Sequence, residues 1–287
     1  RAQENTDFKD EIAILAESCP EAEVIVNPDR LAGATEAIKK YAAKVLIMDD
    51  GFQHRRLARD LDIVAIDATQ PFGYGKLLPA GMLREPVSSL KRAGAAVITR
   101  CDQIADAQLS ELEQKLRAIK SDIVIAKSIH AAVSVKYPEP SVIPAKAGIQ
   151  KGSKIMDSCL RRNDNIEQLK GKKVFAFCGI GNPDAFLDTI KNLGAELAGS
   201  KIYDDHHNYT DACLTEISEQ AEELGADLIL TTHKDWTKVI SNFKSQISNF
   251  KSPLPLAYLA IEIKFLSGED KLTALIKETL AGKITQK

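Results

Sequence analysis

The chain has 287 residues, a length that can bury a full core and lies between one large α/β domain and two ordinary ones. Its 38 Lys and Arg residues nearly balance its 40 Asp and Glu residues, so no overall basic charge indicates nucleic-acid binding. The five cysteines are scattered without a Cys-x-x-Cys pair, which argues against a disulfide scaffold or a zinc site and fits a reducing compartment. No apolar run approaches the roughly 20 residues that a membrane-spanning helix needs. We therefore expect two lobes and only a local site for any phosphate group.

In the first half of the chain, short apolar runs alternate with segments of helical periodicity. We predict helices near residues 10–19 and 31–40, and strands at 24–26, 45–48, 63–66, 95–99 and 123–125. Strands that alternate with helices indicate an α/β fold with a mostly parallel sheet covered on both faces. Ligands then belong at the carboxyl ends of the strands.

The second half continues the alternation. We predict strands at 174–178, 228–232 and 256–263, and helices at 184–193, 211–224 and 271–280. The first of these strands runs into Gly179-Ile180-Gly181-Asn182-Pro183, a glycine-rich turn of the kind that lies against a ligand or a neighbouring backbone. A Gly-x-Gly pattern by itself is weak evidence for either.

Two segments interrupt the pattern. Residues 138–167 are rich in Pro, Gly and polar side chains and are predicted to form an inserted linker between a first lobe, 1–137, and a smaller α/β lobe, 168–287. Residues 240–253 contain a seven-residue repeat and are predicted to be a low-complexity insertion. The basic stretch within the linker lacks interleaved aromatic residues, so we interpret it as a solvated loop and predict no nucleic-acid partner.

The first cluster of ionisable residues follows the predicted strand at 45–48. Asp49 and Asp50 come directly after Val-Leu-Ile-Met and before Gly51. In nucleotide-hydrolysing folds, an aspartate at the end of such a buried strand holds Mg²⁺ while phosphate is transferred. The alternative is a buried strand that ends in a solvated Asp-Asp-Gly turn without a ligand.

A second cluster lies in the long, Gly- and Pro-punctuated segment 73–86. Long irregular segments in compact α/β domains are often functional. Its last residues include Arg84, whose planar guanidinium suits phosphate oxygens, and Glu85, an acid that could orient it or reach a metal. An ordinary surface ion pair remains the alternative.

A third cluster is Tyr203-Asp204-Asp205-His206-His207-Asn208-Tyr209-Thr210. A histidine beside carboxylates can act as a base, tune a neighbouring carboxylate or bind a metal. Adjacent histidines point in different directions, so one of His206 and His207 would serve a given site. The alternative is a polar helix entry in which Thr210 or Asp211 caps the following helix.

Four motifs together resemble the tetraacyldisaccharide 4′-kinase family of lipid A biosynthesis. The longest is Asp-Asp-Gly-Phe-Gln-His-Arg-Arg-Leu-x-Arg-Asp-Leu-Asp-Ile-Val at 49–64, in which only Ala58 is left open. The others are Leu-Leu-Pro-Ala-Gly-x-Leu-Arg-Glu-Pro at 77–86, Gly-Ile-Gly-Asn-Pro at 179–183 and Asp-His-His-x-Tyr-Thr at 205–210. The resemblance covers most of the chain apart from the two insertions.

The resemblance implies a P-loop NTPase-like α/β lobe and a smaller α/β lobe, with the active site in the cleft between them. It also implies that ATP and Mg²⁺ are used to phosphorylate the 4′-hydroxyl of a lipid-linked tetraacyl glucosamine disaccharide-1-phosphate. Asp49 and Asp50 are similar to the family's Mg²⁺ and ATP carboxylates, and Arg84 and Glu85 to its active-site Arg-Glu. The implied location is cytoplasmic and peripheral, at the inner face of the bacterial inner membrane.

The same resemblance assigns the catalytic pair. The family's Gly-Asp-Glu-Pro motif appears as Lys9-Asp10-Glu11-Ile12, which makes Asp10 the expected base for the sugar hydroxyl. His206 resembles the histidine that pairs with that aspartate. Lys9 and Ile12 replace the glycine and proline that flank the base in the family, which changes the turn that aims Asp10.

The chain contains no Gly-x-x-x-x-Gly-Lys-[Ser/Thr], the phosphate-binding loop that the family carries upstream of its Gly-Asp-Glu-Pro motif. We therefore expect these 287 residues, as an N-terminally truncated form, to bind ATP poorly and to transfer phosphate at or near the background rate. The alternative functions are a catalytically impaired remnant or a non-catalytic module that binds the lipid-linked sugar.

Overall fold

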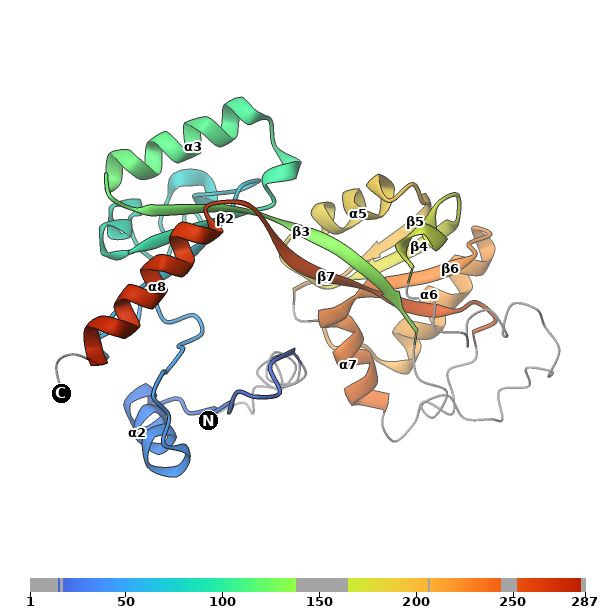
Figure 1. The fold of residues 1–287 in the computed structure, drawn as a ribbon. Helices are drawn as coiled ribbons and strands as arrows, with labels where there is room; N and C mark the ends of the chain where they lie inside the picture. The colour runs from blue at the N-terminus through green and yellow to red at the C-terminus, as the bar shows by residue number, and fades with distance from the viewer. Residues whose placement is uncertain (1–14, 16–17, 138–164, 206, 244–251, 285–287) are drawn as a thin grey trace. The chain divides into compact units, whose positions relative to one another are not determined.

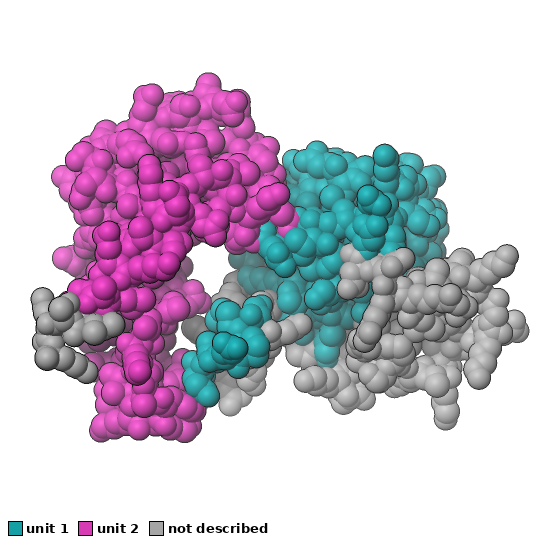
Figure 2. Space-filling view, viewed as in Figure 1, with its two compact units in different colours: residues 1–24, 132–262 teal, residues 25–131, 263–287 magenta. Residues whose placement is uncertain are grey.

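The computed structural model of the chain describes residues 15, 18–137, 165–205, 207–243 and 252–284 (Figure 1). Five predictions fall largely or wholly outside these residues: the base Asp10, most of the helix near 10–19, most of the linker at 138–167, His206, and most of the insertion at 240–253. By packing, the chain divides into two units, coloured separately in Figure 2. Unit 1 comprises residues 1–24 and 132–262, and unit 2 comprises residues 25–131 and 263–287. The predicted lobe bounds, 1–137 and 168–287, stay a prediction.

Unit 2 is built on parallel strands. β1 (Ile63–Asp67) pairs with β2 (Ala95–Thr99), and β2 pairs with the first residues of β3 (Val124–Lys136). The helices described in this unit are α2 (Arg30–Tyr41), α3 (Asp106–Ile119), α8 (Glu269–Ile284) and the 3-10 turns η1 (Gly73–Gly75), η2 (Val87–Arg92) and η3 (Cys101–Gln103).

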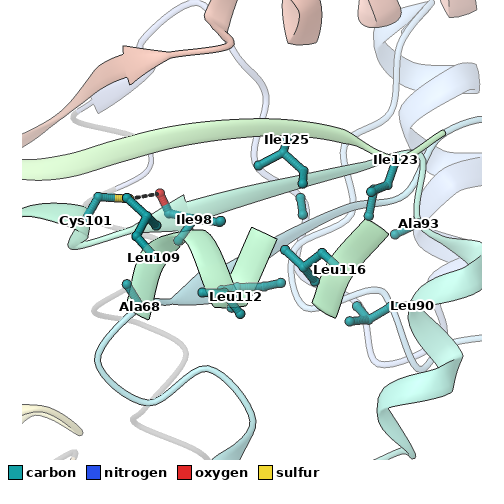
Figure 3. Close-up of a cluster of buried hydrophobic side chains, with 12 residues drawn as sticks. Ala68, Leu90, Ala93, Ile98, Cys101, Leu109, Leu112, Leu116, Ile123 and Ile125 are labelled. Carbon is teal, nitrogen blue, oxygen red and sulfur yellow. Dashed lines mark hydrogen bonds between the residues drawn. The ribbon is translucent and has the colours of Figure 1, made fainter. Parts of the chain in front are cut away.

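The core of unit 2 forms because α3 places leucines at helical spacing on one face. Leu109, Leu112 and Leu116 are buried against β2, where Ile98 is fully buried (Figure 3). Burying such side chains contributes about 1.5–3 kcal/mol each relative to leaving them exposed. This packing fixes the sheet that carries the loops of the candidate site.

Unit 1 has its own parallel arrangement. β4 (Lys173–Cys178) lies between β5 (Glu196–Ile202) and β6 (Leu228–Thr232), and β6 also pairs with β7 (Leu256–Ser267). The helices are α5 (Pro183–Asn192), α6 (Asp211–Glu223), α7 (His233–Phe243) and the 3-10 turn η4 (Ile166–Leu169). Alternate residues of β4 pack into two different apolar clusters, so both of its faces are covered.

The strands are hydrogen-bonded in the order β1-β2-β3-β7-β6-β4-β5. β3 and β7 are long strands, and each contributes residues to both units. The predicted fold class, α/β with a mostly parallel sheet and flanking helices, is confirmed. Within the described residues, no helix is both long enough and apolar enough to cross a membrane.

The strands predicted at 24–26 and 45–48 are wrong as structural assignments. Neither segment is a strand, and Val45, Leu46 and Ile47 are 55%, 48% and 95% exposed. The physical reason is that a parallel strand requires a hydrogen-bonded neighbour, and no described strand lies beside these segments. Asp49 and Asp50 therefore follow an exposed segment without regular secondary structure instead of the expected buried strand.

Candidate functional site

The Asp49–Asp50 pair forms the exposed tip of a turn in unit 2. Asp50 has φ 46°, in the left-handed region, which Asp tolerates better than most residues. A Cβ at Gly51 would lie 2.5 Å from the Sδ atom of Met48, so only glycine fits without moving that side chain. The turn therefore presents both carboxylates to solvent, a conformation that its own sequence favours.

Arg84 reaches this turn from the second predicted cluster, 34 residues along the chain. Its Nη1 donates to Asp50 Oδ2 over 2.6 Å, and both side chains are largely exposed, at 60% and 66%. The loop that carries Arg84 is closed by backbone hydrogen bonds from Leu78 N to Leu83 O and from Leu83 N to Lys76 O. Two motifs that were singled out separately in the sequence thus meet in space.

Glu85 turns toward Arg92 at the end of η2. Arg92 Nη2 donates to both carboxylate oxygens, at 3.1 and 2.9 Å, and also to Phe52 O at 3.3 Å. The Arg92 guanidinium lies over the Phe52 ring, 4.4 Å from its centroid. Burial raises the pKa of Glu85, but hydrogen bonds from Ser89 and Arg92 and nearby positive charge outweigh it and hold the pKa below its ordinary value.

Arg59, which was not predicted as a site residue, fixes the loop that follows the acidic turn. Its Nε donates to Asp62 Oδ1 over 2.5 Å, and its Nη1 and Nη2 donate to the carbonyls of Phe52, His54 and Leu57. Arg59 and Asp62 are only 16% and 15% exposed. The signal was available within the 49–64 motif, where a lone Arg before Asp-Leu-Asp suits a clamp on carbonyl oxygens.

The third cluster lies in unit 1 between β5 and α6. The His207 ring stacks on Tyr203 with ring centroids 4.2 Å apart, and the backbone N–H of His207 donates to the backbone carbonyl of Asp204 over 3.0 Å. Burial, followed by the charge of Lys238, lowers the pKa of His207, although Asp204 and Asp235 act in the opposite direction. The ring is therefore biased toward its neutral form.

Thr210 confirms the predicted cap at the end of this cluster. Its hydroxyl accepts from Cys213 N over 3.3 Å, and α6 begins at Asp211, whose acidic side chain suits the helix N-terminus. Just before it, Asp205 pairs with Lys234 at 3.3 Å on the surface of the unit. The helix-capping interpretation and a role for the histidines are compatible, because different residues serve each.

A buried polar group, also missed in the sequence, lies beside this loop at the carboxyl ends of β4 and β6. Asp235 is fully buried and its Oδ2 accepts from Gly179 N at 3.1 Å and from the Thr232 hydroxyl at 2.7 Å. Lys238 is 4% exposed, with its Nζ 3.7 Å from Asp235 Oδ1. The signal in the sequence was a charged pair at i and i+3 that follows an apolar strand.

The structure therefore brings together some of the predicted site residues. Asp49, Asp50, Arg84 and Glu85 all lie in unit 2, and Asp50 contacts Arg84 directly. The roles proposed for Asp10 and His206 remain predictions, because both residues lie outside the described part of the chain. Among the residues that are described, no group of three or more His, Cys, Asp or Glu side chains is arranged to hold a metal ion. Two adjacent carboxylates, Asp49 and Asp50, are the donors that could bind one with additional ligands.

Comparisons with known proteins agree with the motifs. Residues 1–281 match the family model LpxK, tetraacyldisaccharide-1-P 4′-kinase. Relatives from several bacteria carry the name tetraacyldisaccharide 4′-kinase. Those of Anaeromyxobacter sp. strain K and strain Fw109-5 are 33% and 36% identical over 272 residues, 95% of this chain and 65% and 66% of the relatives. The relative of Halothermothrix orenii is 36% identical over 229 residues, 80% of this chain and 57% of its own length. The chain thus spans less than two thirds of the length of these relatives.

A solved structure shares the fold. The crystal structure of the "apo" form of LpxK from Aquifex aeolicus in complex with ATP superimposes with a TM-score of 0.57 at 25% identity. The match covers 94% of this chain and 69% of that one. The family model covers nearly the whole chain, and the curated relatives exceed 30% identity along most of it. The chain therefore belongs to the tetraacyldisaccharide-1-P 4′-kinase family.

Proposed function

We propose that the protein takes part in the ATP-dependent phosphorylation of the 4′-hydroxyl of a tetraacyl glucosamine disaccharide-1-phosphate, a step of lipid A biosynthesis. The observation that carries the proposal is the contact between Asp50 and Arg84, which joins the two most specific family motifs in unit 2. Acidic and guanidinium groups at one solvent-accessible point suit a metal-bound nucleotide phosphate. The names of the relatives supply the substrate class.

The proposed Mg²⁺ ligands fit the chemistry of the ion. Mg²⁺ is usually held by one or two carboxylates together with water and substrate phosphates, so it does not need a cage of protein ligands. Asp49 and Asp50 provide two exposed carboxylates on one turn. When bound, the ion would neutralise charge on the transferred phosphoryl group. ATP as the phosphate donor is supported by the likeness to LpxK of Aquifex aeolicus, whose structure contains ATP.

The remaining roles in the proposal come from the family pattern. Asp10 would accept the proton of the 4′-hydroxyl, and His206 would tune that carboxylate. Arg84 would contact phosphate oxygens, and Glu85 would orient the arginines around it. The proposed location is the cytoplasmic face of the inner membrane, because the acceptor is a lipid.

A single experiment separates the proposed reaction from the non-catalytic alternatives. The 287-residue chain is incubated with radiolabelled ATP, Mg²⁺ and the tetraacyl disaccharide-1-phosphate in detergent micelles, and both disaccharide binding and phosphate transfer are measured. Transfer at a normal kinase rate that Asp50→Asn abolishes would support the proposal and contradict the near-background rate expected without the phosphate-binding loop. Binding without transfer would assign the lipid–sugar-binding role, and absence of both would refute the proposal for this chain.

A further inference from the structure

The buried acid Asp235 joins two different loops of unit 1. It lies in the first turn of α7, where its own N–H donates to the Thr232 hydroxyl at 3.1 Å and that hydroxyl donates back to its Oδ2 at 2.7 Å. A residue that only caps a helix needs no hydrogen-bond partner outside that helix. The same Oδ2 also accepts the N–H of Gly179, 56 residues away at the end of β4. Asp235 therefore fixes the start of α7 and the Gly179–Gly181 turn at once.

Lys238 places a second charge in the same interior. It lies one turn further along α7, is 4% exposed, and its Nζ is 3.7 Å from Asp235 Oδ1. Such a pair contributes little net stability compared with apolar residues of the same volume, because both charges lose their hydration. Removing only one of the partners is costly, since the other remains charged in a buried site. The pair is thus better explained by the geometry that it imposes than by the stability that it adds.

Asp204 and His207, which precede α6, pack directly on the Gly179 turn that Asp235 holds. A Cβ built on Gly179 would lie 2.9 Å from Asp204 O and 3.1 Å from His207 Cβ, so the glycine turn and the loop that contains these two residues are in backbone contact. Tyr209 is 1% exposed, and burial, followed by the charge of Asp235 and a hydrogen bond to it, raises its pKa. Through Gly179, Asp235 therefore supports the chain at Asp204 and His207.

We propose that Asp235 and Lys238 are positioning residues that hold the Gly179–Gly181 turn against Asp204 and His207 and so fix the orientation of the His207 ring. The inference rests on the proposed function, in which a histidine of this loop tunes the base. It assigns a role to the His-Lys-Asp-x-x-Lys segment at the start of α7, which the kinase motifs do not include. The residues act through the loop and do not touch the reacting groups.

The first test measures hydrogen exchange of individual backbone amides by NMR. In Lys238→Met, exchange at the Gly179 and His207 amides is expected to rise by at least about tenfold, because the buried Asp235 loses its partner. Exchange at core amides of β4, such as Phe177, is expected to stay close to wild type. Lys238→Arg should restore the slow exchange, since it keeps the charge.

A matched control exists in α5, where Asp188 and Lys191 have the same i, i+3 spacing at 3.1 Å but are more than half exposed. Lys191→Met should leave every amide unchanged. Should Lys238→Met fold poorly, the double variant Asp235→Leu/Lys238→Met removes both charges and also the oxygen that accepts the Gly179 N–H, so it must still loosen the two amides. Unchanged exchange at these amides, or an equal rise at all amides including Phe177, would overturn the proposal.

The second test uses the kinase reaction itself. In the active protein, Lys238→Met is expected to lower kcat by at least about tenfold and to leave the KM for ATP unchanged, with recovery in Lys238→Arg. The pKa of His207 is measured in the same variants. The groups that face its ring are Lys238, Asp235, Asp204, Tyr203, Tyr209 and Cys213. If the wild-type protein transfers no phosphate, the proposed function fails, whereas the exchange measurement still decides the positioning role. A wild-type kcat in an active Lys238→Met variant would contradict the inference.

Discussion

Two arginine–aspartate pairs of unit 2 differ sharply in burial, and this difference predicts losses of stability of different size when each pair is removed. Arg59 and Asp62 are 16% and 15% exposed, whereas Arg84 and Asp50 are 60% and 66% exposed. Removing one partner of a buried pair costs about 3–5 kcal/mol, while exposed pairs contribute about 0.2–1 kcal/mol. Because solvent still reaches the Arg59 pair, we expect Arg59→Ala to cost about 3 kcal/mol, at the low end of the buried range. Arg84→Ala should cost less than about 1 kcal/mol.

The assay is native-state hydrogen exchange in urea, with the β1 and β2 amides as reporters of unit 2. The only tryptophan, Trp236, is buried in unit 1, so its fluorescence provides an internal control for the unit that is not mutated. Arg59→Ala is expected to lower the free energy of opening at Ile66 and Ile98 and to leave the fluorescence transition in place. Equal losses for the two variants, or a larger loss for Arg84→Ala, would refute the reasoning from burial.

Three further predictions concern single side chains. Glu85 has a pKa below its ordinary value of 4.5, so it stabilises the fold above that pH and the contribution is lost as the pH falls through the lowered pKa. The urea midpoint of Glu85→Gln should therefore fall below that of wild type at pH 7, and the difference should shrink as the pH is lowered below 4.5. Burial raises the pKa of Cys178 to about 12. Mass spectrometry should therefore find Cys178 unmodified by iodoacetamide at pH 8 after the exposed Cys19 has reacted. Rapid alkylation of Cys178 in the native protein would contradict this prediction. Leu116 is fully buried in α3, so Leu116→Ala should lower the free energy of unfolding, measured by urea denaturation, by about 2–5 kcal/mol. A loss below about 1 kcal/mol would contradict this and show that neighbouring side chains fill the cavity.

The elements that were predicted well are those in which burial and pattern agree. β6 runs over the predicted residues 228–232, and β4 and α5 match within one residue, since each combines an apolar pattern with a clear turn or cap. β5 at Glu196–Ile202 was not predicted, because its Ala, Gly and Ser content gives little strand propensity and its place depends on the neighbouring β4. The segment 45–48 fails for the converse reason, because a strong apolar run does not form a strand without a partner to bond to.

The site residues that were predicted and those that were missed differ in a similar way. Motif residues such as Asp50 and Arg84 were recognisable because their type and order match a family, and their meeting in unit 2 agrees with that grouping. Arg92, Asp235 and Lys238 were missed because their importance lies in contacts with distant backbone, such as Arg92 with Phe52 O across 40 residues and Asp235 with Gly179 across 56. No spacing rule in a single sequence reports such pairings.

The four candidate residues in unit 2 also differ in burial, which bears on the roles proposed for them. A group that is to contact an incoming phosphate or metal ion must give up its present partner, so its existing pairing has to be weak. The exposed Asp50–Arg84 pair meets this condition, because solvent screens it and its exchange for a phosphate oxygen costs little. Glu85 does not meet it as well, since Arg92 holds both of its oxygens at 21% exposure and its pKa is lowered. We infer that Glu85 acts by fixing Arg92 and the Phe52 carbonyl, while Asp49, Asp50 and Arg84 are the groups available to a ligand.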